Sequence, residues 1–119
     1  MAIINWSQTL PLTQVSIEAV EAKSGIYRLS YQSAEGPLYV FFVGRSDTSL
    51  KEDLMKLAHR ESDNVCIKTH LENLECYFKY AIVEDENYRK NSERSLYEHF
   101  KPKCNLDVPT GNLIDLNLS

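Results

Sequence analysis

The chain has 119 residues, of which 43% are apolar and 25% are charged, a composition typical of a single globular domain. Its formal net charge of −4 excludes a generally basic surface of the kind that binds nucleic acid nonspecifically. No apolar run approaches the roughly 20 residues that a membrane-spanning helix needs, and the first residues lack the basic and apolar pattern of a signal peptide. We therefore expect a cytoplasmic protein without a membrane partner.

Basic residues are concentrated in one segment of this acidic chain. Residues 89–103 contain five cations and only two carboxylates. Because binding to phosphate requires positive charge, any surface that contacts nucleic acid is expected to include this segment. Its basic residues are Arg89, Lys90, Arg94, Lys101 and Lys103.

The cysteines and histidines show no local pattern of a disulfide framework or a zinc site. No two cysteines form a Cys-x-x-Cys pair, and no two histidines have His-x-x-x-His spacing. We therefore expect reduced cysteines that pack in the interior, and no transition-metal site. The residues concerned are Cys66, Cys76, Cys104, His59, His70 and His99.

The N-terminal part of the chain predicts a β-hairpin. Residues 1–15 form an irregular extension around Pro11, and residues 16–21 favour one or two helical turns. Residues 25–31 alternate apolar and polar side chains, as in a half-buried strand. Residues 38–44 are almost wholly apolar, as in a strand buried on both faces. A short turn joins these two strands, so we expect them to pair as an antiparallel hairpin.

A helix is expected next, because residues that favour a helix N-terminus precede an apolar stripe. Ser46, Asp47 or Ser49 can cap this helix, which continues to about Arg60. A second short helix is expected over residues 67–73. The apolar stripe of the first helix consists of Leu50, Leu54 and Leu57.

The last predicted elements are a strand and a longer helix. Residues 74–83 are rich in aromatic and β-branched side chains and predict a third strand. The acidic residues 84–86 suit the positive end of a helix dipole, and a helix is predicted over residues 86–100, ending before Pro102. The order of elements is therefore ββα(α)βα. It describes an α/β fold in which helices flank a small three-stranded antiparallel sheet.

The C-terminal tail, residues 107–119, is left open between three alternatives. It breaks at residues 109–111, and residues 113–118 alternate only partly. The tail is compatible with an added edge strand, with docking on a partner protein or a second copy of the chain, or with a loose end. Residues 1–119 are read as one domain with a core over about residues 16–106.

Two tripeptides in the predicted hairpin carry a resemblance to a known family. Gly25-Ile26-Tyr27 and, 14 residues later, Phe42-Val43-Gly44 resemble the paired motifs that name the GIY-YIG nuclease superfamily. A glutamate, an apolar pair and a Pro-x-x-Asn pattern near the end of the core are similar to the closing signature of that superfamily. The resemblance covers about residues 16–106 and implies its fold. The closing positions are Glu93, Leu96, Tyr97, Pro102 and Asn105.

This resemblance implies hydrolysis of DNA phosphodiester bonds with one divalent cation, Mg²⁺ or Mn²⁺. It implies that Glu93 binds the cation, that Tyr27 contacts or deprotonates the attacking water, and that Asn105 supports the site. This assignment of roles is chemically coherent, because cleavage of a phosphodiester needs a positioned water, a base and positive charge beside the phosphate. We therefore expect the Tyr27 hydroxyl and the Glu93 carboxylate to face one shallow cleft.

Two positions depart from the superfamily pattern. Phe42 replaces a second tyrosine, and Asp53 stands where the pattern has an arginine that holds the scissile phosphate. An anion at the second position has the wrong sign for binding phosphate. Arg45, directly after the second motif, is the first candidate for a substitute cation, because some superfamily members carry a functional Lys or Arg there. Lys56 and Arg60 are the second and third candidates.

Two functions follow from these residues. One is a magnesium-dependent DNA endonuclease whose catalytic candidates are Tyr27, Arg45, Glu93 and Asn105. The other is a non-catalytic module that keeps the fold and binds nucleic acid or a protein partner. The missing arginine, the missing hydroxyl and the net acidity favour a degenerate, impaired site.

Overall fold

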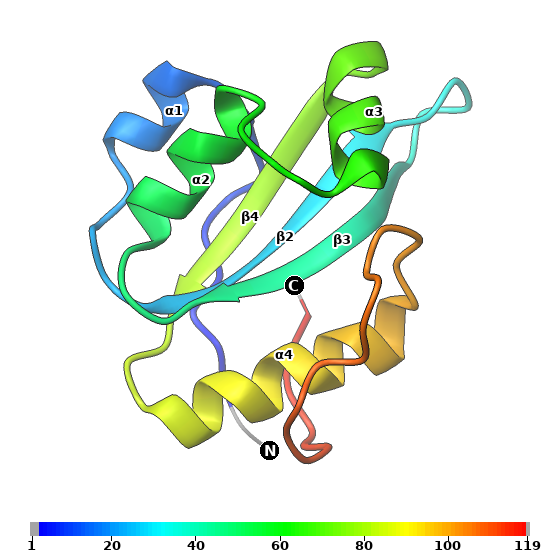
Figure 1. Ribbon diagram of the computed structural model, residues 1–119. Helices are drawn as coiled ribbons and strands as arrows, with labels where there is room; N and C mark the ends of the chain where they lie inside the picture. The colour runs from blue at the N-terminus through cyan, green and yellow to red at the C-terminus, as the bar shows by residue number, and fades with distance from the viewer. Residues whose placement is uncertain (1–2, 119) are drawn as a thin grey trace.

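The fold is organised around the β-hairpin that the alternation of apolar residues predicts. The computed structural model describes residues 3–118 and arranges them as an α/β sandwich (Figure 1). The predicted order of strands and helices over residues 25–100 is confirmed. In chain order the elements are β1 (Leu10–Pro11), α1 (Gln14–Glu18), β2 (Gly25–Gln32), β3 (Leu38–Ser46), α2 (Leu50–Ala58), α3 (Val65–Asn73), β4 (Cys76–Ile82) and α4 (Glu86–Phe100).

β2 lies inside the sheet, with β3 on one side and β4 on the other. The strand order is β1-β4-β2-β3, and all pairings are antiparallel. The predicted pairing of β2 with β3 is confirmed, with Tyr27 opposite Gly44 and Ile26 opposite Arg45. The register shifts between Leu29 and Ser30, where β3 carries an extra residue. Because β3 is last in the strand order, it is an edge strand.

The expectation of three strands is wrong, because a fourth strand lies in the N-terminal extension. Leu10 and Pro11 form β1 and pair with Phe78 and Tyr77 of β4. Two residues are too few to show the alternation of a strand, and proline lacks the N–H that a central strand needs. At the edge of a sheet a residue without an N–H is tolerated where that position faces away from the neighbouring strand. This short segment therefore forms the edge of the sheet opposite to β3.

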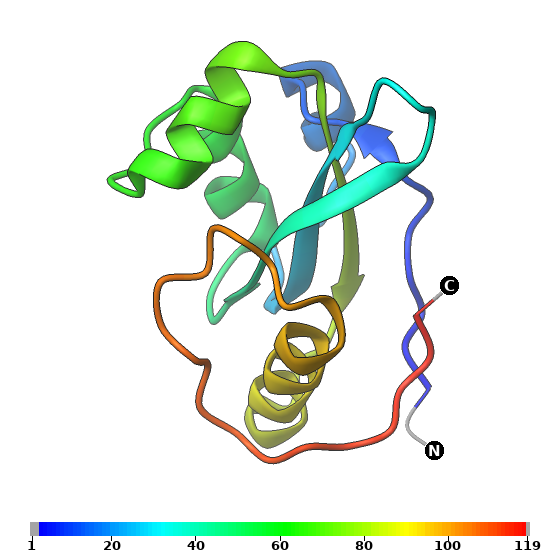
Figure 2. The ribbon, with the colours of Figure 1, turned by 90° about the vertical axis from the view of Figure 1, so that its right-hand side faces the viewer.

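Different helices cover the two faces of the sheet. α1, α2 and α3 lie on one face and α4 lies on the other, as the two views show (Figures 1 and 2). Alternate residues of β2 point to the two faces. Tyr27 and Leu29 belong to the apolar cluster under α1–α3, whereas Ile26 belongs to the cluster under α4. This alternation decides which side chains can meet at the site.

Side-chain caps fix where the three longer helices begin. Ser49 caps α2, Asn64 caps α3 and Asp85 caps α4, and each accepts a hydrogen bond from a backbone N–H in the first turn. α4 ends at Phe100, and the residue that follows it, Lys101, has a left-handed backbone with φ of 46°. None of the helices within residues 3–118 is both long enough and apolar enough to cross a bilayer.

The C-terminal tail packs on the chain's own N-terminal segment. The two terminal segments lie side by side in the ribbon (Figure 2). The Asn117 side chain accepts a hydrogen bond from the Ile4 N–H at 2.6 Å and donates one to the Ile4 carbonyl at 2.8 Å. The tail crosses α4 at Gly111, where φ is +126° and a Cβ would collide with the helix backbone. Leu116 and Leu118 pack on the cluster under α4. The tail is therefore part of the fold and not a loose end.

Ile17→Ala is expected to lower the free energy of unfolding by about 2–5 kcal/mol, because it leaves a cavity at a fully buried position. Val15→Ala is the matched control on the same helix. Val15 is 80% exposed, so its loss should change stability by no more than about 0.5 kcal/mol. Chemical denaturation measures both values. Equal stabilities for the two variants would contradict the packing of α1 described above.

Candidate functional site

A shallow hollow of about 520 Å³ opens between β3, α4 and the chain that follows α4. Arg45, Glu93 and Asn105, three residues that the sequence singles out, all line it. We refer to it as the Glu93 hollow. Its other lining residues are Phe42, Asp47, Asn64 and residues 106–110.

Arg45 and Glu93 form an ion pair inside the Glu93 hollow. Arg45 Nη1 donates to Glu93 Oε1 at 2.7 Å, the distance of a charge-assisted hydrogen bond. Arg45 stands opposite Ile26 in the strand register and therefore points to the face that α4 covers. The Glu93 side chain is 12% exposed and that of Arg45 is 24% exposed, so each charge relies on the other in place of water.

This pair is one end of a chain of four alternating charges. Arg45 Nε donates to Asp47 Oδ1 at 3.1 Å, and Arg89 Nε donates to the same oxygen at 2.9 Å. Arg89 is 5% exposed, and its Nη1 donates to Ser24 and to two backbone carbonyls just after β4. The network therefore ties the end of β3, the loop before α2 and the first turns of α4 into one unit.

Burial and pairing act in opposite directions on the ionisable groups of the network. Burial raises the pKa of Glu93 above its ordinary value, and the Arg45 guanidinium opposes this rise without cancelling it. Burial alone would lower the pKa of Arg45, but the hydrogen bonds and charges of Glu93 and Asp47 raise it. Burial would raise the pKa of Asp47, but Arg89 and Arg45 bring it below its ordinary value. The charged form of Glu93 therefore depends mainly on Arg45.

Asn105 is bound to the outer edge of β3. Its Oδ1 accepts a hydrogen bond from the Val43 N–H at 3.0 Å, and its Nδ2 donates to the Val43 carbonyl at 2.9 Å. The Cys104 N–H donates to the Phe41 carbonyl at 2.9 Å. Residues 104–105 thus pair with the edge strand as a short additional strand would. Asn105 holds one wall of the Glu93 hollow in place.

Tyr27 packs beneath the hairpin and does not line the Glu93 hollow. It is 7% exposed, and its ring covers Gly44, where a Cβ would lie 2.7 Å from the ring. Burial raises the pKa of the Tyr27 hydroxyl strongly, and the negative charges of Asp53 and Glu93 raise it further. The Tyr27 hydroxyl is therefore within the electrostatic influence of Glu93. The sequence leads us to expect that the two groups face one cleft, but Tyr27 does not line the Glu93 hollow.

The two departures from the superfamily pattern lie close to Tyr27. Phe42 is among the residues that line the Glu93 hollow, and its ring centroid is 6.1 Å from that of Tyr27. Asp53 of α2 is near enough for its charge to raise the pKa of Tyr27. An apolar ring and an anion thus occupy positions for which the resemblance implies a hydroxyl and a cation.

The other two candidates for a phosphate-binding cation lie outside the Glu93 hollow. Lys56 and Arg60 are exposed side chains of α2 and of the loop after it. Arg60 lines a separate hollow of about 230 Å³ between α2, α3 and the start of β4. Arg45 alone of the three candidates lines the Glu93 hollow, and it is bound to two carboxylates there.

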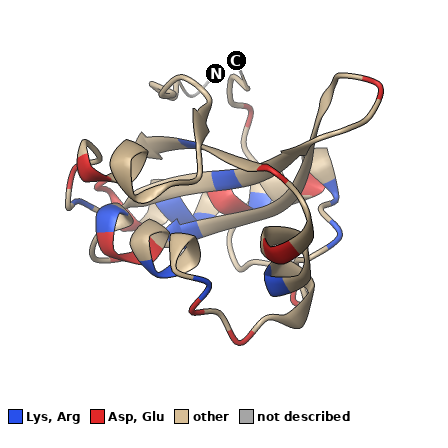
Figure 3. Cartoon of the chain, turned by 90° about the horizontal axis from the view of Figure 1, so that it is seen from above, with Lys and Arg blue, Asp and Glu red and all other residues tan. Residues whose placement is uncertain are grey.

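Most cations of the basic segment at residues 89–103 are paired with carboxylates. Four of its five cations form ion pairs, and two of them share Glu98, so pairing reduces the positive charge of the surface that the sequence assigns to phosphate without cancelling it. Positive and negative residues share the same elements and do not separate into two regions (Figure 3). The pairs are Arg89–Asp47, Lys90–Glu86, Arg94–Glu98 and Lys101–Glu98.

The expectation of reduced cysteines is wrong for two of the three. Cys66 and Cys104 form a disulfide across 38 positions of sequence, whereas Cys76 is free. The chain after α4 returns to the start of α3, where Asn64 Nδ2 donates to the Cys104 carbonyl at 2.8 Å. A contact of this kind is tertiary and leaves no local spacing pattern. The disulfide ties α3 to the residue before Asn105 and so to the wall of the Glu93 hollow.

Asp47 and Arg89 belong to the network although the sequence gives them other roles. Asp47 reads as a possible helix cap and Arg89 as part of a basic surface. The signal that the sequence does contain is Glu93, because a carboxylate in the apolar stripe of a helix needs a partner. Its partner Arg45 is 48 positions away, so local spacing cannot identify it.

The Glu93 hollow contains oxygen ligands of the kind that Mg²⁺ prefers, but their present partners do not fit a bound cation. The carboxylates of Asp47, Glu93 and Asp107 line it. Asp47 and Glu93 are both bound to guanidinium groups. A cation at Glu93 would have to displace Arg45 first. The arrangement is that of a closed ion-pair network and not of a metal site.

Comparison with known proteins assigns no family to this geometry. No protein family, curated protein or solved structure matches the chain. The residues of the Glu93 hollow therefore carry the functional argument, because the function of a protein depends on the chemistry of its site more than on its fold.

Asn105→Ala is expected to lower the free energy of unfolding by about 1–3 kcal/mol, because the backbone N–H and carbonyl of Val43 lose their partners. The Val43 amide should also exchange with solvent at least roughly tenfold faster. Without Asn105 its N–H has lost the hydrogen-bond partner that protects it, so a smaller local opening is enough for exchange. Asn73→Ala is the matched control, because the exposed Asn73 amide donates only to its own helix. Unchanged exchange at Val43 in Asn105→Ala, measured by NMR, would show that Asn105 does not hold this strand edge.

Arg45→Ala is expected to lower the free energy of unfolding at neutral pH by roughly 3 kcal/mol, because it leaves the Glu93 carboxylate largely buried and unpaired. The pKa of Glu93 then rises further above its unfolded value. A carboxyl whose folded pKa is raised binds its proton more tightly in the folded state, so the variant gains stability as the pH falls through that folded pKa.

The deficit of Arg45→Ala relative to wild type should thus be largest near neutral pH and shrink toward about pH 4.3, the ordinary pKa of glutamate. Lys90→Ala breaks an exposed i,i+4 pair and should cost less than about 0.5 kcal/mol at every pH. Denaturation curves over this pH range test the point. A deficit that does not change with pH would mean that Glu93 does not depend on Arg45.

Proposed function

We propose that this chain is a GIY-YIG-like domain whose nuclease site is closed by an internal ion pair, so that its magnesium-dependent DNA hydrolysis is impaired. The bond of 2.7 Å between Arg45 and Glu93 inside the Glu93 hollow carries this proposal. The two residues that the resemblance assigns to phosphate and to metal are bound to each other.

The first reason for impairment is competition for Glu93. One carboxylate can hold Mg²⁺ when waters and the substrate phosphate complete its six oxygen ligands. In this chain the Arg45 guanidinium already neutralises that carboxylate and is itself held by Asp47. A cation would have to leave its water shell and break a partly buried hydrogen bond, and both steps oppose binding.

The second reason concerns the water that attacks the phosphate. A tyrosine that accepts a proton from water must be deprotonated, or close to it, at the working pH. Burial and the charges of Asp53 and Glu93 raise the pKa of Tyr27, which favours its neutral form. Phe42 lines the hollow without a hydroxyl that could assist. Neither of the two positions that the superfamily pattern assigns to tyrosine therefore supplies an effective base.

The charge of the Glu93 hollow favours a second function, that of a non-catalytic module that binds a protein partner and not nucleic acid. Its three lining carboxylates, Asp47, Glu93 and Asp107, outnumber the two guanidinium groups, Arg45 and Arg89, that pair with Asp47 and Glu93. An excess of negative charge repels phosphate. Leu106 and Val108 on the same rim are 74% and 53% exposed, an apolar surface of the kind that protein partners cover.

In a plasmid assay with Mg²⁺ or Mn²⁺, the wild-type chain is expected to nick supercoiled DNA no faster than Glu93→Gln does. The reason is that the wild-type carboxylate is paired and holds no cation. The conversion of supercoiled into nicked circles measures the rate. Cleavage by wild type that Glu93→Gln abolishes would contradict the proposal and establish an active nuclease.

The variant Phe42→Tyr/Asp53→Arg/Arg45→Gln is expected to gain magnesium-dependent cleavage over the parent. It adds the hydroxyl and the cation that the superfamily pattern requires, and it releases Glu93. One such electrostatic donor is worth on the order of a hundredfold in rate, so the gain should be measurable. Binding to duplex DNA should also show a steeper salt dependence, because the net charge of this region becomes more positive.

The matched control is the same triple variant with Glu93→Gln, which should bind DNA and not cut it. Circular dichroism confirms that each variant is folded. A folded triple variant that neither binds DNA more tightly nor cleaves it would reject the proposed closed nuclease site and leave the protein-binding module.

A further inference from the structure

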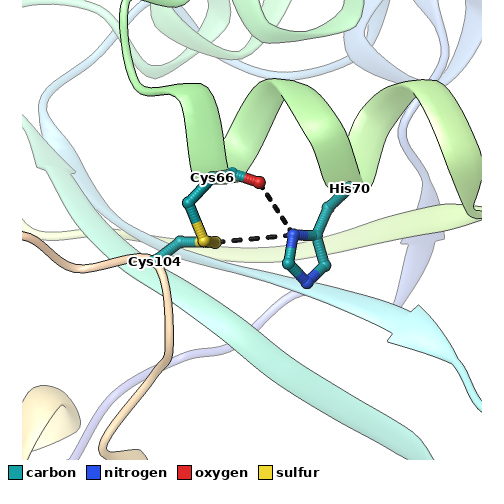
Figure 4. A group of neighbouring side chains, drawn as sticks. All are labelled: Cys66, His70 and Cys104. Atoms are coloured by element: carbon teal, nitrogen blue, oxygen red, sulfur yellow. Dashed lines mark hydrogen bonds between the residues drawn. A yellow bond between two sulfur atoms is a disulfide. The ribbon is translucent and has the colours of Figure 1, made fainter.

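Three side chains that can bind metal meet at the start of α3, apart from the ion-pair network. The ligand atoms of Cys66, His70 and Cys104 lie within 4.8 Å of one another, and this is the one such group among the Cys, His, Asp and Glu residues of the described chain. Cys66 and His70 are one helical turn apart on α3, and Cys104 reaches them from the segment after α4 (Figure 4). Two sulfurs and one imidazole nitrogen form a ligand set that zinc prefers.

One edge of a tetrahedral zinc site is already present in this group. His70 Nδ1 lies 3.5 Å from Cys104 Sγ. With Zn–S bonds of about 2.3 Å and Zn–N bonds of about 2.1 Å, a tetrahedral site places sulfur and nitrogen ligands about 3.6 Å apart. The edge between the two sulfurs is missing, because they are bonded to each other, and a zinc site would need them about 3.8 Å apart.

The surroundings hold two of the three ligands in position. The His70 ring stacks on Phe41 with centroids 4.5 Å apart and an interplanar angle of 12°. Cys104 is fully buried, and Asn64 donates to its carbonyl. Cys66 lies in the first turn of α3, which contains no acidic residue, and the positive end of the helix dipole favours a negatively charged sulfur there. Cys66 is only partly buried, so it is the ligand with room to turn when the sulfurs separate.

We propose that reduction of the Cys66–Cys104 disulfide converts this group into a binding site for Zn²⁺ or a similar thiophilic divalent cation. A dithiol reductant supplies two electrons and two protons, becomes a disulfide itself and leaves two cysteine thiols. Zn²⁺ displaces the two thiol protons and binds both sulfurs and His70 Nδ1. The imidazole proton moves to Nε2, and the Cys66 carbonyl loses the hydrogen bond of 2.8 Å that Nδ1 now donates. Water fills the fourth position.

The metal would preserve a connection that reduction otherwise removes. In the oxidised chain the disulfide joins α3 to the segment whose next residue, Asn105, holds the edge of β3. A zinc ion on the same side chains joins the same two segments in a reducing compartment. The wall of the Glu93 hollow is therefore held in either redox environment, by a covalent bond or by a metal.

The test compares the wild-type chain with and without its disulfide. The chain is reduced with a phosphine under exclusion of air, freed of metal with a chelator, and titrated with Co²⁺ as a spectroscopic substitute for Zn²⁺. One Co²⁺ per chain should give thiolate-to-cobalt charge-transfer absorption, and Zn²⁺ should displace it. The oxidised chain should show no such absorption. Its absence from the reduced, folded chain would overturn the proposal without recourse to any variant.

Substitutions then identify the ligands. Cys66→Ser or Cys104→Ser should remove about half of the charge-transfer intensity, because one of two thiolates is lost, and His70→Ala should weaken binding at least roughly tenfold. Cys76→Ser is the matched control. Its thiol donates to the His70 carbonyl but lies outside the group, so binding should not change. Binding that survives Cys104→Ser unchanged, or that Cys76→Ser abolishes, would place the metal elsewhere and reject this site.

Discussion

The hydrogen bond between Arg45 and Glu93 connects the stability of the fold to the chemistry of the site. It joins the end of β3 to the middle of α4, and it allows a carboxylate to occupy the apolar stripe of α4 with a side chain that is only 12% exposed. Asp47 and Arg89 extend the bond into a network that reaches the end of β4. A metal ion at Glu93 and this network are alternatives, because both require the same carboxylate.

The segment after α4 completes the site, and it does so through contacts with parts of the chain that are distant in sequence. Asn105 pairs with Val43, and Cys104 is linked to Cys66 of α3. Without these contacts the edge of β3 would be open and the Glu93 hollow would lose one wall. The cysteines matter to the site for this reason, although they lie outside it, and the proposed zinc ion would maintain the same connection where disulfides are reduced.

The parts of the fold that the sequence predicts are those with a local physical cause. The hairpin follows from alternation and the helices from caps such as Ser49, because each of these signals is contained within a few residues. β1 is missed because Leu10 and Pro11 are too few to show a period. The disulfide and the Arg45–Glu93 pair are missed because their partners are 38 and 48 positions apart in the sequence. Glu93 itself stands out in the sequence, but what it binds depends on how β3 and α4 pack.

The central claim is that Arg45, and not a divalent cation, neutralises Glu93. It is tested most directly by soaking crystals of the wild-type chain in Mn²⁺ and recording anomalous scattering at the manganese edge. Our account predicts no anomalous peak beside Glu93, with Arg45 Nη1 still within hydrogen-bond distance of its carboxylate. A manganese ion bound to Glu93, with the Arg45 side chain turned away, would contradict it.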